Sequence, residues 1–172
     1  LLCVHNFKYL GVVIDDELKW TDHIMHVYKK LLKFTGIFYK LRDKLPPAVL
    51  KNMYYAFVHS HVLYAVEIYA NTCPTYLDKL VKLNNKILRI IQNKPFRSHV
   101  ADLYIQYKTL PIPLLHEQQL LLFVYTVLNC PYVLPEVFTG YFDFNNILHS
   151  HNTLSSKIYI CIGLTPPLVN VV

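Results

Sequence analysis

Glycine is scarce in this chain of 172 residues, which contains four: Gly11, Gly36, Gly140 and Gly163. A loop that cradles phosphate groups needs several glycines close together, because glycine lets the backbone approach the phosphate closely. The wide spacing of these four glycines therefore excludes a glycine-rich phosphate-binding loop.

Cysteine is also sparse, and its four positions are scattered, with no CxxC pair: Cys3, Cys73, Cys130 and Cys161. Zinc sites and disulfide frameworks of small secreted proteins show recurring cysteine spacings, which are missing here. We therefore expect reduced thiols and an intracellular protein of the nucleus or cytoplasm that is not secreted.

Long apolar runs and targeting segments are missing as well. No run reaches the roughly 18 apolar residues that a membrane span needs, and the polar residues Glu117-Gln118-Gln119 precede the most apolar helical stretch, Leu120 to Leu128. The start, Leu1-Leu2-Cys3-Val4, has no basic region, no cleavage pattern and no initiator Met, so it is not a signal peptide. We expect no membrane partner, and a fragment that begins within a domain.

Acidic residues are few in the front of the chain. Residues 1–108 hold 16 Lys or Arg and 8 Asp or Glu, whereas residues 109–172 hold one Lys and three acidic residues. A basic front half indicates a polyanionic partner. Residues 109–172 carry few charges, so we expect them to pack within the protein instead of binding a polyanion.

The hydrophobic pattern changes period near the start of the chain. Phe7 to Ile14 is rich in aromatic and β-branched residues around one glycine, which predicts a strand. Asp15-Asp16-Glu17 predicts a turn, and Thr21 is the expected N-cap of a helix that runs to about Lys44. The apolar residues of that helix fall on one face: Ile24, Val27, Leu31, Phe34, Phe38 and Leu41.

Two rows of basic residues are the strongest functional signal. The first basic stripe lies on another face of the first predicted helix: Lys29, Lys33, Lys40 and Lys44. The second basic stripe lies on a later predicted helix and is extended by Lys94 and Arg97: Lys79, Lys82, Lys86 and Arg89. Tyrosines lie among or near these rows: Tyr28, Tyr39, Tyr54, Tyr55 and Tyr76. Lysine and arginine contact phosphates and aromatic rings stack on bases, so the rows indicate either a nucleic-acid-binding surface or merely solvated charged helix faces.

The remaining pattern is also helical. A second helix begins near Pro47, and the sequence leaves open whether His59 to Tyr69 continues it or follows a break. A third begins with a capping box in form, Thr75-Tyr76-Leu77-Asp78, and ends near Asn93. A short helix is expected around Val100 to Lys108. A fourth long helix is expected from Pro113 to about Asn129, and it should be central in a bundle because it is apolar nearly all round. One more short helix is expected within Val133 to Phe142.

The predicted fold is mainly α: an irregular bundle of four to five helices with a short N-terminal β element. Residues 1–20 would form that β element, 21–108 a basic helical bundle and 109–156 a further helical region. Residues 157–172 lack helical period and capping signals, so a poorly ordered tail is expected.

Histidine and serine motifs do not converge on a catalytic or metal site. His59-Ser60-His61 and His149-Ser150-His151 have alternate spacing, which does not suit one helix face, and His23 with His26 lacks an evident third ligand. Ser60 has no nucleophile elbow around it. We expect structural roles for these residues, no catalytic residue, no metal site and no cofactor in this chain.

Several segments in order resemble the reverse transcriptase of jockey-like non-LTR (LINE-type) retrotransposons. The first is Lys8-Tyr9-Leu10-Gly11-Val12, followed by an acidic pair, Leu-x-Trp and His-Ile. The later segments are Ser60 to Ala65 with Glu67-Ile68-Tyr69, Leu80 to Ile91, Leu110-Pro111-Ile112, and His149 to Thr153. The family has Asn-Thr-Arg where this chain has Asn152-Thr153-Leu154.

The resemblance implies a part of an RNA-directed DNA polymerase that lies after the catalytic palm. Tyr9, Leu10 and Gly11 would belong to the primer grip, residues 21–108 to a thumb, and residues 109–156 to a connection region. The expected partners are the RNA–DNA primer–template duplex and the palm and fingers of the parent enzyme, whose magnesium ions the palm would hold. The chain alone should not catalyse. The alternatives are a helical protein-interaction domain and a degenerate retroelement remnant without activity.

Ile14-Asp15-Asp16 mimics the metal-binding signature of polymerases, in which two aspartates lie at a hairpin tip. That signature needs a second apolar strand after the aspartates and another aspartate from a neighbouring strand. Here Glu17 to Trp20 leads into a helix. A simple turn is therefore predicted.

Overall fold

The computed structural model describes residues 5–129, 135, 142–144 and 159–161. The chain divides into two compact units, Leu1–Leu120 and Leu121–Val172, which are considered separately. The fold is mainly helical with a small N-terminal sheet, as the sequence predicts.

The N-terminal β element is a hairpin. Strands β1 (Asn6–Tyr9) and β2 (Val12–Asp15) pair antiparallel, with Tyr9 opposite Val12. The two residues between them have positive φ, 46° at Leu10 and 86° at Gly11, as the favoured two-residue hairpin turn requires. The prediction of one strand through Gly11 is therefore wrong, because the glycine reverses the chain.

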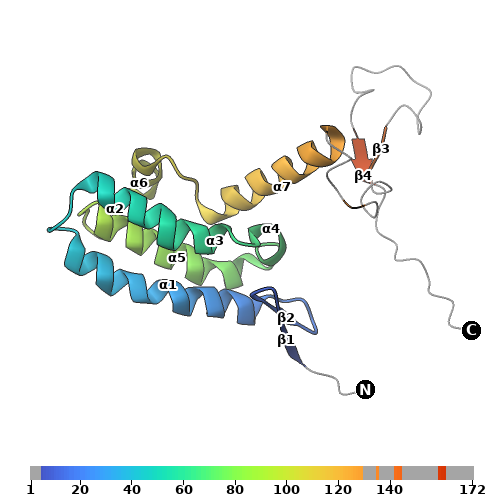
Figure 1. The fold of residues 1–172 in the computed structure, drawn as a ribbon, viewed down its shortest axis with the longest axis horizontal. Helices are drawn as coiled ribbons and strands as arrows, with labels where there is room; N and C mark the ends of the chain where they lie inside the picture. Colours follow the sequence, from blue (N-terminus) through green and yellow to red (C-terminus); the bar gives the residue numbers. More distant parts are fainter. Residues whose placement is uncertain (1–4, 130–134, 136–141, 145–158, 162–172) are drawn as a thin grey trace, which may run out of the picture. The chain divides into compact units, whose positions relative to one another are not determined.

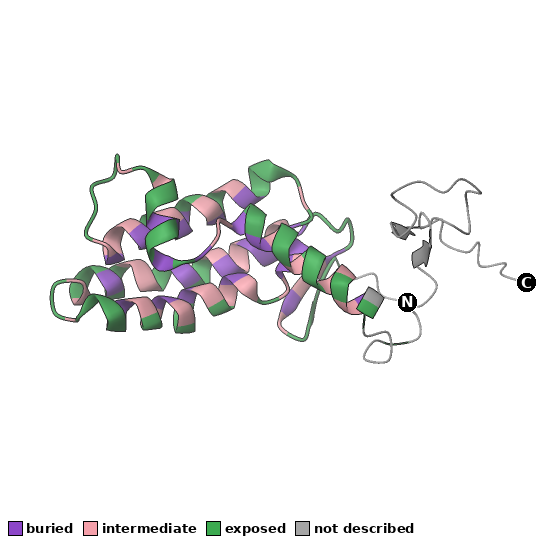
Figure 2. Ribbon diagram, turned by 90° about the horizontal axis from the view of Figure 1, so that it is seen from above, coloured by how far each residue is buried: buried purple, intermediate pink, exposed green. Residues whose placement is uncertain are grey.

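Three helical segments build the core of the first unit (Figure 1). Helix α1 (Thr21–Leu41) and helix α5 (Pro74–Ile91) pack together, and the chain returns between them through α2 (Pro47–Tyr54), η1 (Tyr55–His59) and α3 (Ser60–Leu63). The predicted apolar face of the first helix is confirmed at Leu31 and Phe38, which are completely buried. Leu80 and Leu88 of α5 are completely buried too. Figure 2 shows this buried layer between the helices.

The structure resolves the open question at residues 59–69 in favour of a break. The helix continues through the π-helical segment η1 to Leu63, where Tyr64 becomes extended and Ala65 adopts a left-handed conformation with φ 59°. A new short helix, α4 (Val66–Tyr69), follows, and its Tyr69 hydroxyl donates a hydrogen bond to the Val62 carbonyl. Burial of Val66 and Tyr69 stabilises the short helix that follows the break.

The predicted helix ends need correction. Trp20, with φ 63°, occupies the N-cap of α1 in place of Thr21, and α1 ends at Leu41 instead of continuing to Lys44. Cys73 is the N-cap of α5, so the capping box predicted at residues 75–78 does not form. Its last member, Asp78, instead forms an ion pair with Lys82.

After α5, the described part of the chain continues with α6 (Val100–Tyr107), as predicted, and α7 (Ile112–Asn129). The prediction that α7 is central in a bundle is wrong, because Ile112 and Leu115 are buried while Leu114 and Leu120 are exposed. Of α7, the core cluster of the first unit includes Ile112 and Leu115. Of the helices in the described part of the chain, none is long and apolar enough to cross a membrane.

In the second unit, β3 (Phe142–Phe144) pairs antiparallel with β4 (Tyr159–Cys161). The sequence did not predict this pairing, which places three residues of the expected tail in a strand. Apart from residue 135 and Phe142, which begins β3, the helix expected at Val133 to Phe142 lies outside the described residues. His149-Ser150-His151, Leu154 and most of the expected tail also lie outside them.

Candidate nucleic-acid interface

The predicted primer-grip residues lie at the tip of the N-terminal hairpin. Tyr9 and Leu10 are exposed, and the hydroxyl of Tyr64 donates a hydrogen bond to the Leu10 carbonyl. A Cβ added to Gly11 would lie 3.7 Å from Cε1 of Tyr64. The tip is therefore held against the break after α3 while its side chains face outward.

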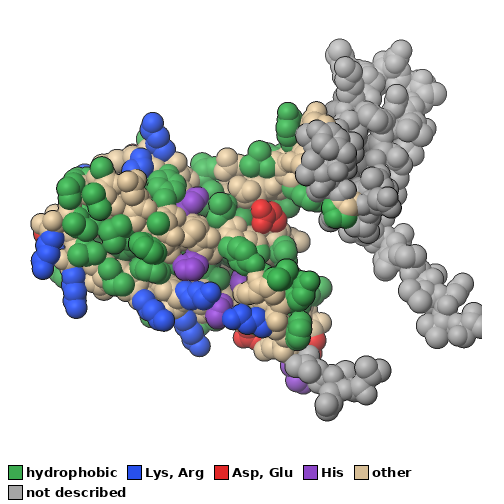
Figure 3. All heavy atoms as spheres, viewed as in Figure 1, with side chains coloured by type: hydrophobic (Ala, Val, Ile, Leu, Met, Phe, Trp, Pro, Cys, Tyr) green, Lys and Arg blue, Asp and Glu red, His purple; other side chains and the backbone are tan. Residues whose placement is uncertain are grey.

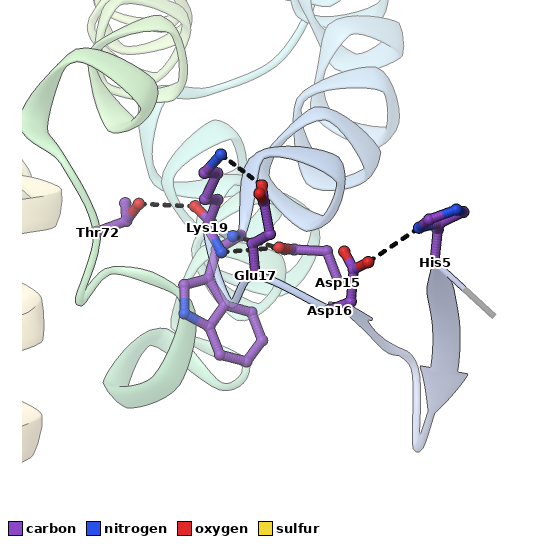
Figure 4. Close-up of polar contacts among 7 residues, drawn as sticks. His5, Asp15, Asp16, Glu17, Lys19 and Thr72 are labelled. Carbon is purple, nitrogen blue, oxygen red and sulfur yellow. Dashed lines mark hydrogen bonds and ion pairs between the residues drawn. The ribbon is translucent and has the colours of Figure 1, made fainter. Parts of the chain in front are cut away.

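The acidic turn has a structural role that occupies its carboxylates. Asp15 is buried, and its two oxygens accept hydrogen bonds from the backbone N–H groups of Lys19 and Trp20, both at 2.8 Å. Asp16 contacts His5 at 2.9 Å, and this hydrogen bond lowers the pKa of the Asp16 carboxyl. These contacts are drawn in Figure 4. No group of three or more metal-ligating side chains is assembled among the described residues.

The same turn fixes the start of α1. Lys19 forms an ion pair with Glu17, and the Thr72 hydroxyl donates a hydrogen bond to the Lys19 carbonyl at 2.7 Å (Figure 4). Trp20 is buried within the core cluster and packs at this junction between the hairpin and α1. The hairpin, the first helix and the chain before α5 thus meet at one point.

The first basic stripe is only partly confirmed as a helix face. Lys29, Lys33 and Lys40 are exposed on α1, away from its buried residues. Lys44 is exposed too, but it lies beyond the end of α1, so helical spacing does not place it in the row. Figure 3 shows basic side chains along the edge of the molecule that α1 forms in Figure 1.

The second basic stripe borders a groove of about 560 Å³, here called the α5 groove. Tyr28 and Leu32 of α1 form part of its lining, and Phe96 contributes from the loop after α5. The helix α5 supplies the rest: Lys79, Lys82, Leu83, Asn85, Lys86 and Arg89. The structure thus brings all four cations of the second stripe together with two aromatic rings.

The sequence did not predict the contact between Arg89 and Phe96 in the lining of the groove. The guanidinium carbon of Arg89 lies 5.4 Å from the centre of the Phe96 ring, and its Nη2 donates to the Ser98 carbonyl at 3.5 Å. Phe96 is 83 % exposed. An exposed aromatic residue between Pro95 and Arg97 was the available signal, but only folding places it beside α5.

Two of the tyrosines predicted near the basic rows have structural roles instead. The buried Tyr54 hydroxyl donates to Asn84 at 3.1 Å, and burial raises its pKa. The Tyr55 hydroxyl donates to the carbonyls of Tyr107 and Lys108. Tyr28, Tyr39 and Tyr76 are the members of this set that remain accessible.

His23 of α1 makes a structural contact with the N-terminal hairpin. His23 is 2 % exposed and its Nδ1 accepts the backbone N–H of Val13 at 3.2 Å. Burial, with smaller contributions from His26 and Lys30, lowers the pKa of His23 to about 4. The Ser60 hydroxyl donates to the Ala56 carbonyl at 2.6 Å, so it is not paired with a histidine for catalysis.

Comparison with known proteins supports the resemblance seen in the sequence. No family model matches the chain, and no solved structure matches it. Over 107 residues, 60 % of the chain, it is 28 % identical to an RNA-directed DNA polymerase from the mobile element jockey of Drosophila funebris. The matched region covers 12 % of that protein. The resemblance to a fragment of a jockey-like non-LTR reverse transcriptase is therefore confirmed.

Proposed function

We propose that this chain is the part of a non-LTR reverse transcriptase that holds the primer–template duplex and that it catalyses nothing alone. The exposed row of Lys29, Lys33 and Lys40 carries this proposal. From Lys29 to Lys40, α1 rises about 16 Å at 1.5 Å per residue. A row of that length can contact several phosphates of one strand while the opposite face of the helix stays packed.

The charges around the row favour a polyanion. Within residues 29–44 the acidic residue is Asp43, which forms an ion pair with Arg42. Binding of phosphates by this row should also be independent of base sequence, because lysine recognises phosphate as a point charge. A polymerase must hold every sequence that it copies, so such a contact suits a duplex-holding element.

The proposal assigns the magnesium ions of polymerisation to another part of the parent enzyme, because the acidic pair of this chain is engaged in the turn. The carboxylate of Asp15 accepts two backbone N–H groups, and Asp16 is paired with His5. The parent enzyme would hold these ions in its palm. The hairpin tip at Tyr9, Leu10 and Gly11 would lie near the primer end, as the resemblance implies.

The proposal is tested by binding of an RNA–DNA hybrid to a charge-matched pair of variants. Changing Lys29 and Lys33 to Gln should weaken binding for every hybrid sequence, because two phosphate contacts are lost. Changing Lys51 and Lys108 to Gln removes the same charge elsewhere and should have little effect. Equal weakening by the two variants would show that only net charge matters and would contradict a holding surface on α1.

A further inference from the structure

We propose that the α5 groove binds unpaired bases of a single-stranded nucleic acid, as a site separate from the duplex-holding face of α1. This inference rests on the proposed function, since it assigns a second nucleic-acid ligand to the same unit. The observation behind it is the combination of apolar walls and a cationic border in one groove. Neither feature alone would indicate a base-binding site.

The walls of the groove have the chemistry that an unstacked base needs. Leu32 and Leu83 are apolar, and Tyr28 and Phe96 supply aromatic rings. Stacking of a base on an aromatic side chain raises affinity by about fivefold or more and tolerates any base, because every base has a π-face. The volume of about 560 Å³ falls within the range of roughly 300–1,000 Å³ that is typical of ligand sites.

Phe96 lies in a turn that presents its ring to solvent. The backbone N–H of Ser98 donates to the Pro95 carbonyl at 3.0 Å, which closes a turn around Phe96 and Arg97. Arg89 reaches this turn through the Ser98 carbonyl and also lies over the Phe96 ring. Because the ring is 83 % exposed, much of it remains accessible to a ligand.

The border of the groove suits a phosphate backbone. Lys79, Lys82, Lys86 and Arg89 recur every three or four residues, which places them along one side of α5. Lys82 is paired with Asp78 at 2.6 Å, and no other acidic residue lies within α5. A strand whose phosphates follow this row would direct its bases toward the apolar walls.

A duplex cannot use the groove in this way, because its bases are already stacked and paired. Single strands are the nucleic acids whose bases are free to reach aromatic walls. An acidic peptide would satisfy the cations but leave the exposed ring of Phe96 without a stacking partner. The geometry therefore favours a single strand, of either RNA or DNA.

The test measures the affinity of the full chain for labelled 12-nucleotide oligouridylate, for oligothymidylate of the same length, and for an RNA–DNA hybrid. The variant is Phe96→Leu, which keeps an apolar side chain but removes the π-face. Tyr39→Leu is the matched control, since Tyr39 is 59 % exposed and lies beneath Arg42 at 4.4 Å, outside the α5 groove. Both side chains are exposed, so both variants should fold.

We expect Phe96→Leu to weaken single-strand binding by about fivefold or more, with hybrid binding and the Tyr39→Leu control unchanged. Loss with oligouridylate alone would identify RNA, and equal loss with both strands would identify single strands generally. No selective loss would overturn the proposal. The proposal would also be overturned if a polyglutamate peptide bound more tightly than the single-stranded oligonucleotides and its binding depended on Phe96, because that result would indicate a protein partner. The two proposals can also be told apart. If changing Lys29 and Lys33 to Gln leaves hybrid binding unchanged while Phe96→Leu still weakens single-strand binding, the duplex-holding proposal is contradicted and the single-strand site in the α5 groove is supported.

Discussion

The buried carboxylate of Asp15 accepts the backbone N–H of Trp20 at 2.8 Å, across the junction between the hairpin and α1. Its other oxygen accepts the N–H of Lys19. One aspartate therefore satisfies two donors at the point where the chain changes from strand to helix. This contact gives the first aspartate of the acidic pair a structural role at the start of α1.

Replacement of Asp15 by Ala should lower the free energy of unfolding by about 2–4 kcal/mol, because a buried backbone donor at Trp20 and a partly buried one at Lys19 lose a charged acceptor. Urea denaturation followed by circular dichroism measures the change. Asp16→Ala is the control and should alter stability little, since that side chain is exposed. Equal stability of the two variants would show that the Asp15 contacts are not important to the fold.

Trp20→Ala should cost about 3–5 kcal/mol of stability, the range for truncation of a large buried aromatic residue. Trp20 is the single tryptophan of the chain and is 9 % exposed, so native fluorescence should be shifted to shorter wavelength than that of free tryptophan. An emission spectrum like that of free tryptophan would contradict the burial of this side chain.

Stability should fall as the pH is lowered from about 6.5 to 4, in part because of His23. Its pKa is about 4 in the folded chain, where it faces His26, Lys30 and the ring of Tyr69, against 6.5 for an ordinary histidine. The unfolded chain therefore takes up a proton first, and acid favours unfolding by up to about 3 kcal/mol from this group. The contribution of His23 to the free energy of unfolding is fully retained only above about pH 6.5.

The variant His23→Gln keeps a hydrogen-bond acceptor for Val13 but cannot titrate in this range. Its stability should depend less on pH between 7 and 4.5 than that of the wild type, in denaturation curves measured at each pH. Some dependence should remain, since burial also lowers the pKa of His59 and His61. An unchanged pH slope would exclude His23 as a source.

The helices were predictable because their faces follow a 3.6-residue period that the apolar residues report directly. The N-caps were not, because Trp20 and Cys73 are not typical capping residues and their positions depend on tertiary contacts. The β3–β4 pairing joins segments too distant in sequence for local patterns to show. Similarly, the second basic stripe was visible in the sequence, but its groove depends on Tyr28 and Phe96 reaching α5.

The chain should extend no primer when it is supplied with an RNA template, nucleotides and magnesium. The reason is that Asp15 and Asp16 are engaged in the turn and no metal-ligating cluster forms among the described residues. A primer-extension assay on the purified chain measures this. Extension that is abolished by Asp15→Ala would contradict the structural role of the turn.

The most direct measurement is the salt dependence of RNA–DNA hybrid binding by the wild type and by a variant with Lys29, Lys33 and Lys40 changed to Gln. Each phosphate contact that is lost removes close to one unit from the slope of log affinity against log salt concentration. We expect the slope to decrease by about 2–3 units with the fold intact, whatever the hybrid sequence. An unchanged affinity and slope would show that this face of α1 is only solvated, and would contradict its role in holding a duplex.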